Sequence, residues 1–179
     1  SEDGTLRQWK GAGDPQPRLA TAAAVKSLAV SPDGRHLAAG TVAGGLVVWD
    51  AATGRQLAAA QPASGAINCL CWLPDSESFL VASEGRVSRY RIMPGGAGSV
   101  CELVPESPLR GHRRRVFAVA ATADGRRFAT AGEDKTVRLW SPAGEQIAEH
   151  DHPGRGFTVA FAGGGRAARC CEGGLLWRC

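Results

Sequence analysis

Short runs in which apolar and polar residues alternate recur along this chain, separated by segments rich in Gly, Pro, Asp and Ser. Alternation with a period of two places every second side chain on one face of an extended strand, so these runs predict half-buried β-strands. No segment carries the periodicity of an amphipathic helix. The pattern therefore predicts an all-β chain.

The predicted strands form groups of four. The first group comprises Ser27–Val30, His36–Thr41, Leu46–Trp49 and Gln56–Ala60; the second Ile67–Trp72, Ser78–Ser83, Val87–Ile92 and Val100–Val104; the third Val116–Ala121, Arg127–Ala131, Thr136–Trp140 and Gln146–His150. An incomplete last group comprises Phe157–Phe161, Ala167–Cys171 and Leu175–Trp177. Two more strands precede residue 22, so 17 strands are expected in all.

Tight turns are predicted between the first and second strand of each complete group. The turn sequences are SPDG at Ser31–Gly34, LPDS at Leu73–Ser76 and TADG at Thr122–Gly125. An Asp-Gly pair supplies the positive φ angle that a tight hairpin needs. The last group carries Gly163–Gly165 at this place, which predicts a looser turn.

An aromatic residue ends the third strand of each group. These residues are Trp9, Trp49, Tyr90, Trp140 and Trp177, and subtraction of their numbers gives intervals of 40, 41, 50 and 37 residues. The long interval predicts an insertion at Pro94–Ser99 or Pro105–Pro108, which are rich in Gly, Pro and Ser. A regular interval of this size is typical of a repeat protein.

The third group carries the most informative motif, GHRRRVFAVAATADGRRFATAGEDKTVRLW at residues 111–140. A Gly-His pair, two alternating runs, an acidic turn and a third run ending in Trp follow one another. This order resembles a WD-repeat, the unit of a WD40-type β-propeller, and no subfamily is singled out. The resemblance implies an all-β fold of four-stranded antiparallel blades, about four of them in a partial ring.

The blades implied by the resemblance divide residues 1–179 as one propeller segment. A blade remnant spans 1–21, complete blades span about 22–62, 63–108 and 109–152, and an incomplete last blade spans 153–179. Seventeen strands are fewer than a ring of seven four-stranded blades needs, so we expect the C-terminal part of a larger propeller. Each blade buries its faces against its neighbours, and an open arc is therefore expected to self-associate through its apolar flanks.

Four residues of the motif have alternative interpretations. His112, Thr130 and Asp134 contain the groups of a hydroxyl–histidine–carboxylate triad. In the WD-repeat family, however, a histidine, a hydroxyl residue, an aspartate and the terminal tryptophan form a structural hydrogen-bonded tetrad. The resemblance assigns that tetrad to His112, Thr130, Asp134 and Trp140, which predicts no catalytic residue and no enzyme.

An arginine cluster precedes the third group. Arg110, Arg113, Arg114 and Arg115 lie within six residues, and residues 91–179 carry 13 basic against 9 acidic side chains. Arginine binds carboxylates and phosphates in a bidentate manner. In the family this loop lies on the top face near the channel, where partners often bind. The cluster is thus a candidate site for acidic partners, and a solvated rim is the alternative.

Cysteine and histidine patterns predict neither a metal site nor a cofactor. The six cysteines include no C-x-x-C pair, and Cys69 and Cys71 share a strand face, where they are expected to pack as small apolar residues. His150 and His152 supply two ligands only, which favours an ordinary polar loop. The glycine clusters lack the Lys-Ser/Thr of a phosphate-binding loop.

These observations favour a scaffold that binds other proteins or peptides, acidic ones included, in a multiprotein complex of the cytoplasm or nucleus. Arg113–Arg115 leave open a propeller that binds phosphate groups of nucleic acid or phosphoinositide, although missing interleaved aromatics disfavour nucleic acid. A ubiquitin-ligase substrate receptor is a further alternative, but Trp49 and Trp140 lack the Trp-Asp-x-Arg ending of many such receptors. No apolar run is long enough to span a membrane.

Overall fold

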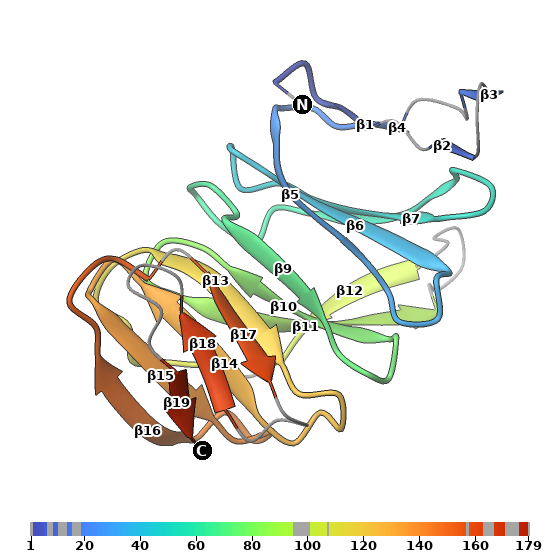
Figure 1. Ribbon diagram of the computed structural model, residues 1–179. Coiled ribbons are helices and arrows are strands. Elements are labelled where there is room, and N and C mark those ends of the chain that lie inside the picture. Colours follow the sequence, from blue (N-terminus) through green and yellow to red (C-terminus); the bar gives the residue numbers. More distant parts are fainter. Residues whose placement is uncertain are drawn as a thin grey trace.

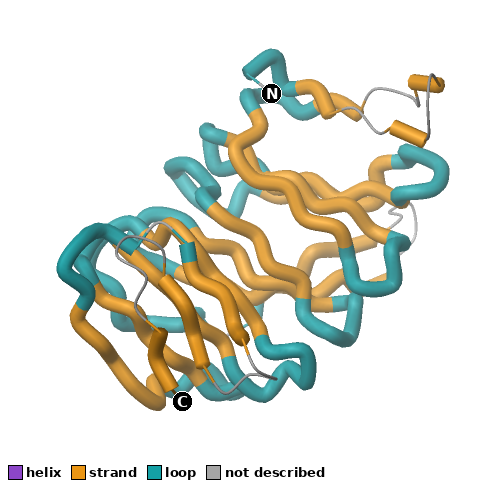
Figure 2. The backbone as a smooth tube through the Cα atoms, in the orientation of Figure 1, coloured by secondary structure: helices purple, strands orange, loops and turns teal. Residues whose placement is uncertain are grey.

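The computed structural model describes residues 2–6, 9–10, 14–15, 19–94, 101–106, 108–156, 158–162, 167–170 and 176–178. All regular elements within these ranges are strands, 19 in number. Successive sheets pack face to face, each rotated relative to the one before it, so sheets that follow one another along the chain are in contact (Figures 1 and 2). The described residues contain no helix that is long and apolar enough to cross a membrane.

Three antiparallel sheets of four strands form the body of the chain. The first contains β5 (Val25–Val30), β6 (His36–Thr41), β7 (Leu46–Asp50) and β8 (Gln56–Ala60); the second β9 (Cys69–Trp72), β10 (Ser78–Ala82), β11 (Val87–Pro94) and β12 (Cys101–Pro105); the third β13 (Val116–Ala121), β14 (Phe128–Gly132), β15 (Thr136–Trp140) and β16 (Gln146–Asp151). Each strand pairs with the next along the chain. The predicted all-β propeller blades are therefore confirmed.

Shorter sheets flank these three. Strands β17 (Val159–Ala162), β18 (Ala167–Cys170) and β19 (Leu176–Arg178) form a three-stranded sheet, while β1 (Thr5–Leu6) pairs with β4 (Leu19–Ala20) and β2 (Trp9–Lys10) with β3 (Asp14–Pro15). The two strands expected before residue 22 are thus described as two short pieces each, because residues 7–8 and 16–18 between the pieces lie outside the described residues. This accounts for 19 described strands in place of 17.

The tight turns have the expected geometry. Gly34 and Gly125 adopt positive φ angles of 72° and 67°, and Ser76 adopts 56° at the same place in the second sheet. A non-glycine residue in this conformation is strained. The Asp33 amide donates to Ser76 Oγ at 3.2 Å, which joins the turns of two adjacent sheets.

The core lies between the sheets. Trp72 and Phe79 of the second sheet pack on Ala38 and Val48 of the first, and the Trp72 indole N–H donates to the Ala29 carbonyl at 3.1 Å. A similar cluster joins the second sheet to the third. Cys69 and Cys71 pack beside that cluster, and burial raises the pKa of Cys71 to about 11, so this thiol is unreactive at neutral pH.

One flank of the first sheet is exposed. Leu28 and Val30 of β5 are 51% and 56% exposed, whereas Leu70 and Trp72, at the matching places of β9, are 7% exposed because the first sheet covers them. Leu6 and Leu19 cover only the part of this flank around Ala39 and Trp49. Self-association through the exposed part stays a prediction.

Several strand ends differ from expectation. Ile67 lies before β9, because its amide donates to the Thr41 carbonyl of the preceding sheet at 3.0 Å. Strand β16 ends at Asp151, one residue beyond the predicted strand, since Asp151 pairs with Thr136. His150 lies in this strand as predicted, so the polar-loop interpretation of this residue is wrong. Phe157, Gly163–Gly165 and most of Pro94–Ser99 lie outside the described residues.

Candidate functional site

A chain of hydrogen bonds crosses the third sheet. Trp140 Nε1 lies 2.8 Å from Thr130 Oγ1, which lies 2.7 Å from His112 Nε2. His112 Nδ1 lies 3.0 Å from both carboxylate oxygens of Asp134. The structure thus brings all four residues of the predicted tetrad together, from β14, β15 and the segments before β13 and between β14 and β15.

Donor and acceptor chemistry gives this chain a direction. An indole N–H can only donate, so Thr130 Oγ1 accepts from Trp140 and its hydroxyl proton is free to donate to His112 Nε2. We therefore assign the proton of neutral His112 to Nδ1, from which it is donated to Asp134. One tautomer satisfies every polar group of the tetrad.

Asp134 connects several groups on one end of the sheets by hydrogen bonds. We call this end, which carries the segments 83–86, 111–115 and 133–135, the top face. Besides His112, it accepts hydrogen bonds from the Arg113 amide at 3.1 Å and from Thr136 Oγ1 at 2.9 Å. Burial opposes ionisation of Asp134, but the Arg113 amide and the nearby His112 outweigh it and hold the pKa below its usual range. Asp134 is therefore an anion at neutral pH.

Burial also lowers the pKa of His112 below its ordinary value of 6.5, although Asp134 acts in the opposite direction. Protonation of Nε2 would remove the acceptor of the Thr130 hydroxyl, which agrees with this direction. The unfolded chain then binds the proton before the folded chain does. Stability from this group is complete above pH 6.5 and declines as the pH falls below it.

We predict that the melting temperature falls between about pH 7.5 and pH 5, a window set by the unfolded histidine. The slope should decrease in His112→Gln, which is less stable but lacks this titrating group. Thermal unfolding at a series of pH values measures both effects. Parallel pH profiles for the two proteins would contradict the assignment of a neutral His112.

The structure adds polar partners that the sequence analysis did not identify. Arg138 is buried, and it donates from Nε to Thr136 Oγ1 at 3.2 Å and from Nη1 to Gln146 Oε1 at 2.7 Å. Its Nη2 lies 3.3 Å from Glu149. Thr136, Arg138 and Trp140 alternate along one strand, and this period of two was the signal that could have placed Arg138 beside the tetrad.

Gly132 lets the tetrad approach the backbone. A Cβ atom at this position would lie 2.9 Å from His112 Nδ1, 3.0 Å from the Arg115 carbonyl and 3.0 Å from Asp134 Oδ1. The Arg115 carbonyl is main chain and the other two atoms are fixed by hydrogen bonds. Only glycine fits without a shift of these groups.

We predict that Gly132→Ala lowers the free energy of unfolding by about 1–3 kcal/mol, the usual effect of overpacking. Chemical denaturation measures the loss. Gly125→Ala is a contrasting variant that reports the cost of a positive φ angle, since Gly125 has a φ of 67° and its Cβ would meet only Pro74 at 3.4 Å, whereas the loss at Gly132 comes from overpacking. Stability equal to wild type in Gly132→Ala would show that the tetrad tolerates the displacement.

The predicted arginine cluster is divided by the structure. Arg113, Arg114 and Arg115 are exposed and line a top-face cavity of about 430 Å³ together with Glu84, Gly85 and Glu133. Arg110 is exposed as well but does not line this cavity.

Ion pairing distinguishes Arg115 from Arg113 and Arg114. Arg115 Nε lies 3.3 Å from Glu84, and Glu133 is paired with Arg155 at 3.6 Å. Within the described part of the chain, Arg113 and Arg114 have no ion pair, and both guanidinium groups remain free for an external anion.

The tetrad is shielded from solvent. Thr130 and Trp140 are fully buried and His112 is 8% exposed, so solvent does not reach the hydroxyl group. The described residues include no group of three or more His, Cys, Asp or Glu side chains that could hold a metal ion. His152 is only 3% exposed, and its Nδ1 lies 3.0 Å from the Gly154 carbonyl oxygen in the same turn. The tetrad can connect strands and fix the top-face segments.

Adjacent four-stranded sheets of this order define a segment of a β-propeller. A solved chain from a structure titled "Crystal Structure of Mitotic Checkpoint Complex" matches the fold with a TM-score of 0.84 at 20% identity, covering 98% of this chain and 55% of that one. Two family models match as well: "WD domain, G-beta repeat" at residues 103–141 and "Anaphase-promoting complex subunit 4 WD40 domain" at residues 7–75. The chain belongs to the WD40-repeat family.

Curated relatives come from several cellular systems. The chain is 31% identical to a ribosome biogenesis protein WDR12 homolog of Brugia malayi, 31% identical to protein groucho of Drosophila melanogaster and 30% identical to target of rapamycin complex subunit wat1 of Schizosaccharomyces pombe. These matches cover 63%, 76% and 59% of this chain but only 26%, 18% and 32% of the relatives. The chain thus spans less than a third of each relative.

Proposed function

We propose that this protein is a scaffold that holds an acidic segment of a partner protein on its top face, in a multiprotein complex. The observation that carries the proposal is the pair Arg113 and Arg114, which lie at the top-face cavity without an ion pair among the described residues. The names of two matched proteins, a target of rapamycin complex subunit and a chain of the mitotic checkpoint complex, place them in complexes and support the class of function.

The backbone around the arginines supports the same function. The Arg113 amide donates to Asp134, and Asp134 is anchored in the tetrad through His112. The arginines therefore extend from a fixed segment, which reduces the entropy lost when they bind an anion. The two glutamates of the cavity are neutralised by Arg115 and Arg155, so they oppose an acidic ligand weakly.

A non-catalytic role is part of this proposal, as is the cytoplasmic or nuclear location. The hydroxyl, imidazole and carboxylate groups of the tetrad are occupied by one another and by strand contacts. A phosphate-bearing ligand is the second candidate, because the same free guanidinium groups recognise phosphate. Steep loss of affinity with salt would favour a polyanion such as nucleic acid.

Affinity capture of the protein followed by mass spectrometry tests the scaffold function. We expect partners with acidic segments to be recovered with wild type and lost with Arg113→Glu/Arg114→Glu/Arg115→Glu. An unchanged list of partners would contradict a role of these arginines but leave the scaffold class intact. Failure to recover any specific partner would contradict the scaffold function itself.

A further inference from the structure

The second sheet carries an ion pair where its neighbours carry apolar pairs. In the first sheet Val48 pairs with Ala58, and in the third Leu139 pairs with Ala148. Val48 and Leu139 lie opposite the alanines of the second strand, Ala38 and Ala129.

Arg89 is at the same register position of β11, opposite Leu80. Its carbonyl accepts from the Glu106 amide at 2.8 Å, which places Glu106 at the position of the alanines on the outer strand. A charged pair thus replaces an apolar pair at this position of the repeat.

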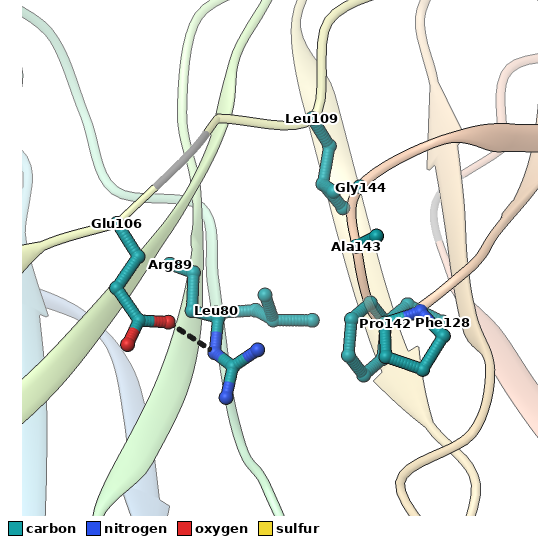
Figure 3. Close-up of a pocket in the computed structure, with 8 residues that line it drawn as sticks. All are labelled: Leu80, Arg89, Glu106, Leu109, Phe128, Pro142, Ala143 and Gly144. Atoms are coloured by element: carbon teal, nitrogen blue, oxygen red, sulfur yellow. Dashed lines mark ion pairs between the residues drawn. The ribbon is translucent and has the colours of Figure 1, made fainter.

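A cavity of about 250 Å³ lies beside this pair (Figure 3). Buried Leu80, Leu109 and Phe128 form its apolar wall. Pro142, Ala143 and Gly144, from the turn between β15 and β16 of the third sheet, form its rim. The cavity is smaller than the roughly 300–1,000 Å³ typical of pockets for drug-sized ligands, and its size suits one large apolar side chain.

The ion pair leaves hydrogen-bonding capacity beside this cavity. Arg89 Nε lies 2.6 Å from Glu106 Oε2, yet its N–H is not directed at that oxygen and is a buried donor without a hydrogen bond. Arg89 and Glu106 line the cavity as an ion pair (Figure 3), and their side chains are 21% and 31% exposed. Of the residues that line the cavity, these two carry a charge, one as a donor and one as an acceptor, and their charges cancel there. Outside the cavity the pair belongs to a larger network, because Glu106 Oε1 accepts from Arg91 Nε at 3.2 Å, Arg91 lies 3.6 Å from Glu77, and Arg89 Nη2 lies 4.0 Å from Asp75.

Stability alone does not account for this pair. An ion pair in a partly buried position is often no more stabilising than apolar residues of similar volume, because both charges lose hydration. The adjacent sheets show that the fold accommodates the apolar alternative at the same position. One donor and one acceptor beside an apolar cavity are complementary to an extended peptide: the pair can bond the carbonyl and N–H groups of its backbone, and the cavity can hold one of its side chains.

We propose that this cavity between the second and third sheets is a second docking site, which binds an uncharged, extended peptide segment of a partner protein. One large aliphatic side chain of the peptide occupies the space between Leu80, Leu109 and Phe128. Arg89 donates to a peptide carbonyl and Glu106 accepts from a peptide N–H. This site is independent of the top-face arginines.

Selection from a displayed library of random linear peptides tests the proposal. Three variants are compared with wild type: Arg89→Leu/Glu106→Ala, which reproduces the apolar pair of the third sheet; Ala143→Tyr, which fills the cavity but keeps the ion pair; and Arg113→Glu/Arg114→Glu, which alters only the top face. We expect enriched peptides with a central Leu, Ile or Met and uncharged neighbours, and an affinity about tenfold lower for the first two variants.

Further readouts distinguish this site from the top-face site. Affinity for the enriched peptides should change by less than about twofold between roughly 0.05 and 0.3 M salt, because the site is neutral. The melting temperature of Arg89→Leu/Glu106→Ala should equal or exceed that of wild type. A marked drop would show that the pair is structural and overturn the proposal. Peptides that are acidic and depend on Arg113 and Arg114, or no enrichment, would overturn it too.

Discussion

Substitution of Trp140 by alanine is expected to lower the free energy of unfolding by about 3–5 kcal/mol, the largest single effect we predict. Trp140 is fully buried in the cluster that joins the second and third sheets. Its removal leaves a cavity between the sheets. It also removes the indole N–H that donates to Thr130 Oγ1, and Thr130 is fully buried, so this oxygen gains no hydrogen bond from water in its place. Equilibrium denaturation, followed by circular dichroism, measures the loss.

Trp140→Phe separates packing from hydrogen bonding. The ring remains apolar, while the N–H donor to Thr130 is lost, so we expect a smaller decrease of about 1–3 kcal/mol. His112→Ala should fall in the same range, because Thr130 and Asp134 each lose a partner. If Trp140→Phe were as damaging as Trp140→Ala, hydrogen bonding and not packing would dominate at this position.

Charge reversal at Arg113 and Arg114 is expected to weaken binding of an acidic peptide by at least about tenfold, the factor that corresponds to 1.4 kcal/mol. Both side chains are exposed and neither has an ion pair within the described residues, so the substitutions remove attraction and add repulsion. Stability should remain within about 0.5 kcal/mol of wild type, as is usual for exposed positions. Titration calorimetry with an acetylated hexaglutamate peptide measures the affinity.

Arg55→Glu/Arg126→Glu is the matched control. Both residues are exposed, the change in net charge is the same, and neither residue lines the top-face cavity. We expect the control to reduce affinity only through the weak, salt-screened effect of net charge. Equal losses in the two double variants would show that the peptide responds to net charge and not to a site.

Periodicity and turn chemistry determined most of the fold. Strands β6, β8, β13 and β15 have the bounds that alternation and the flanking turn residues predicted, because both are local properties of the sequence. Burial itself does not alternate in β15, whose five residues are all buried because sheets pack on both of its faces. The tetrad was assigned to His112, Thr130, Asp134 and Trp140 by the resemblance of residues 111–140 to a WD-repeat. The structure then supplied their hydrogen bonds.

Some features depended on which side chains of neighbouring sheets meet. The sequence shows four clustered arginines, but only the folded chain pairs Arg115 with Glu84 and leaves Arg113 and Arg114 without an ion pair among the described residues. Glu84 belongs to the second sheet's turn and Arg115 to the segment before the third. Local periodicity carries no information about such contacts.

Burial of charge was decided in the same way. Arg138 and Arg89 both resemble solvent-facing strand residues in the sequence, yet Arg138 is buried beside the tetrad and Arg89 faces a cavity closed by the next sheet. The sequence by itself determined the strands and the turns, because these follow from short-range pattern, and the resemblance of residues 111–140 to a WD-repeat indicated the members of the tetrad. Only the tertiary structure decided which charges are paired, buried or free, because distant segments set the electrostatic surroundings of each group.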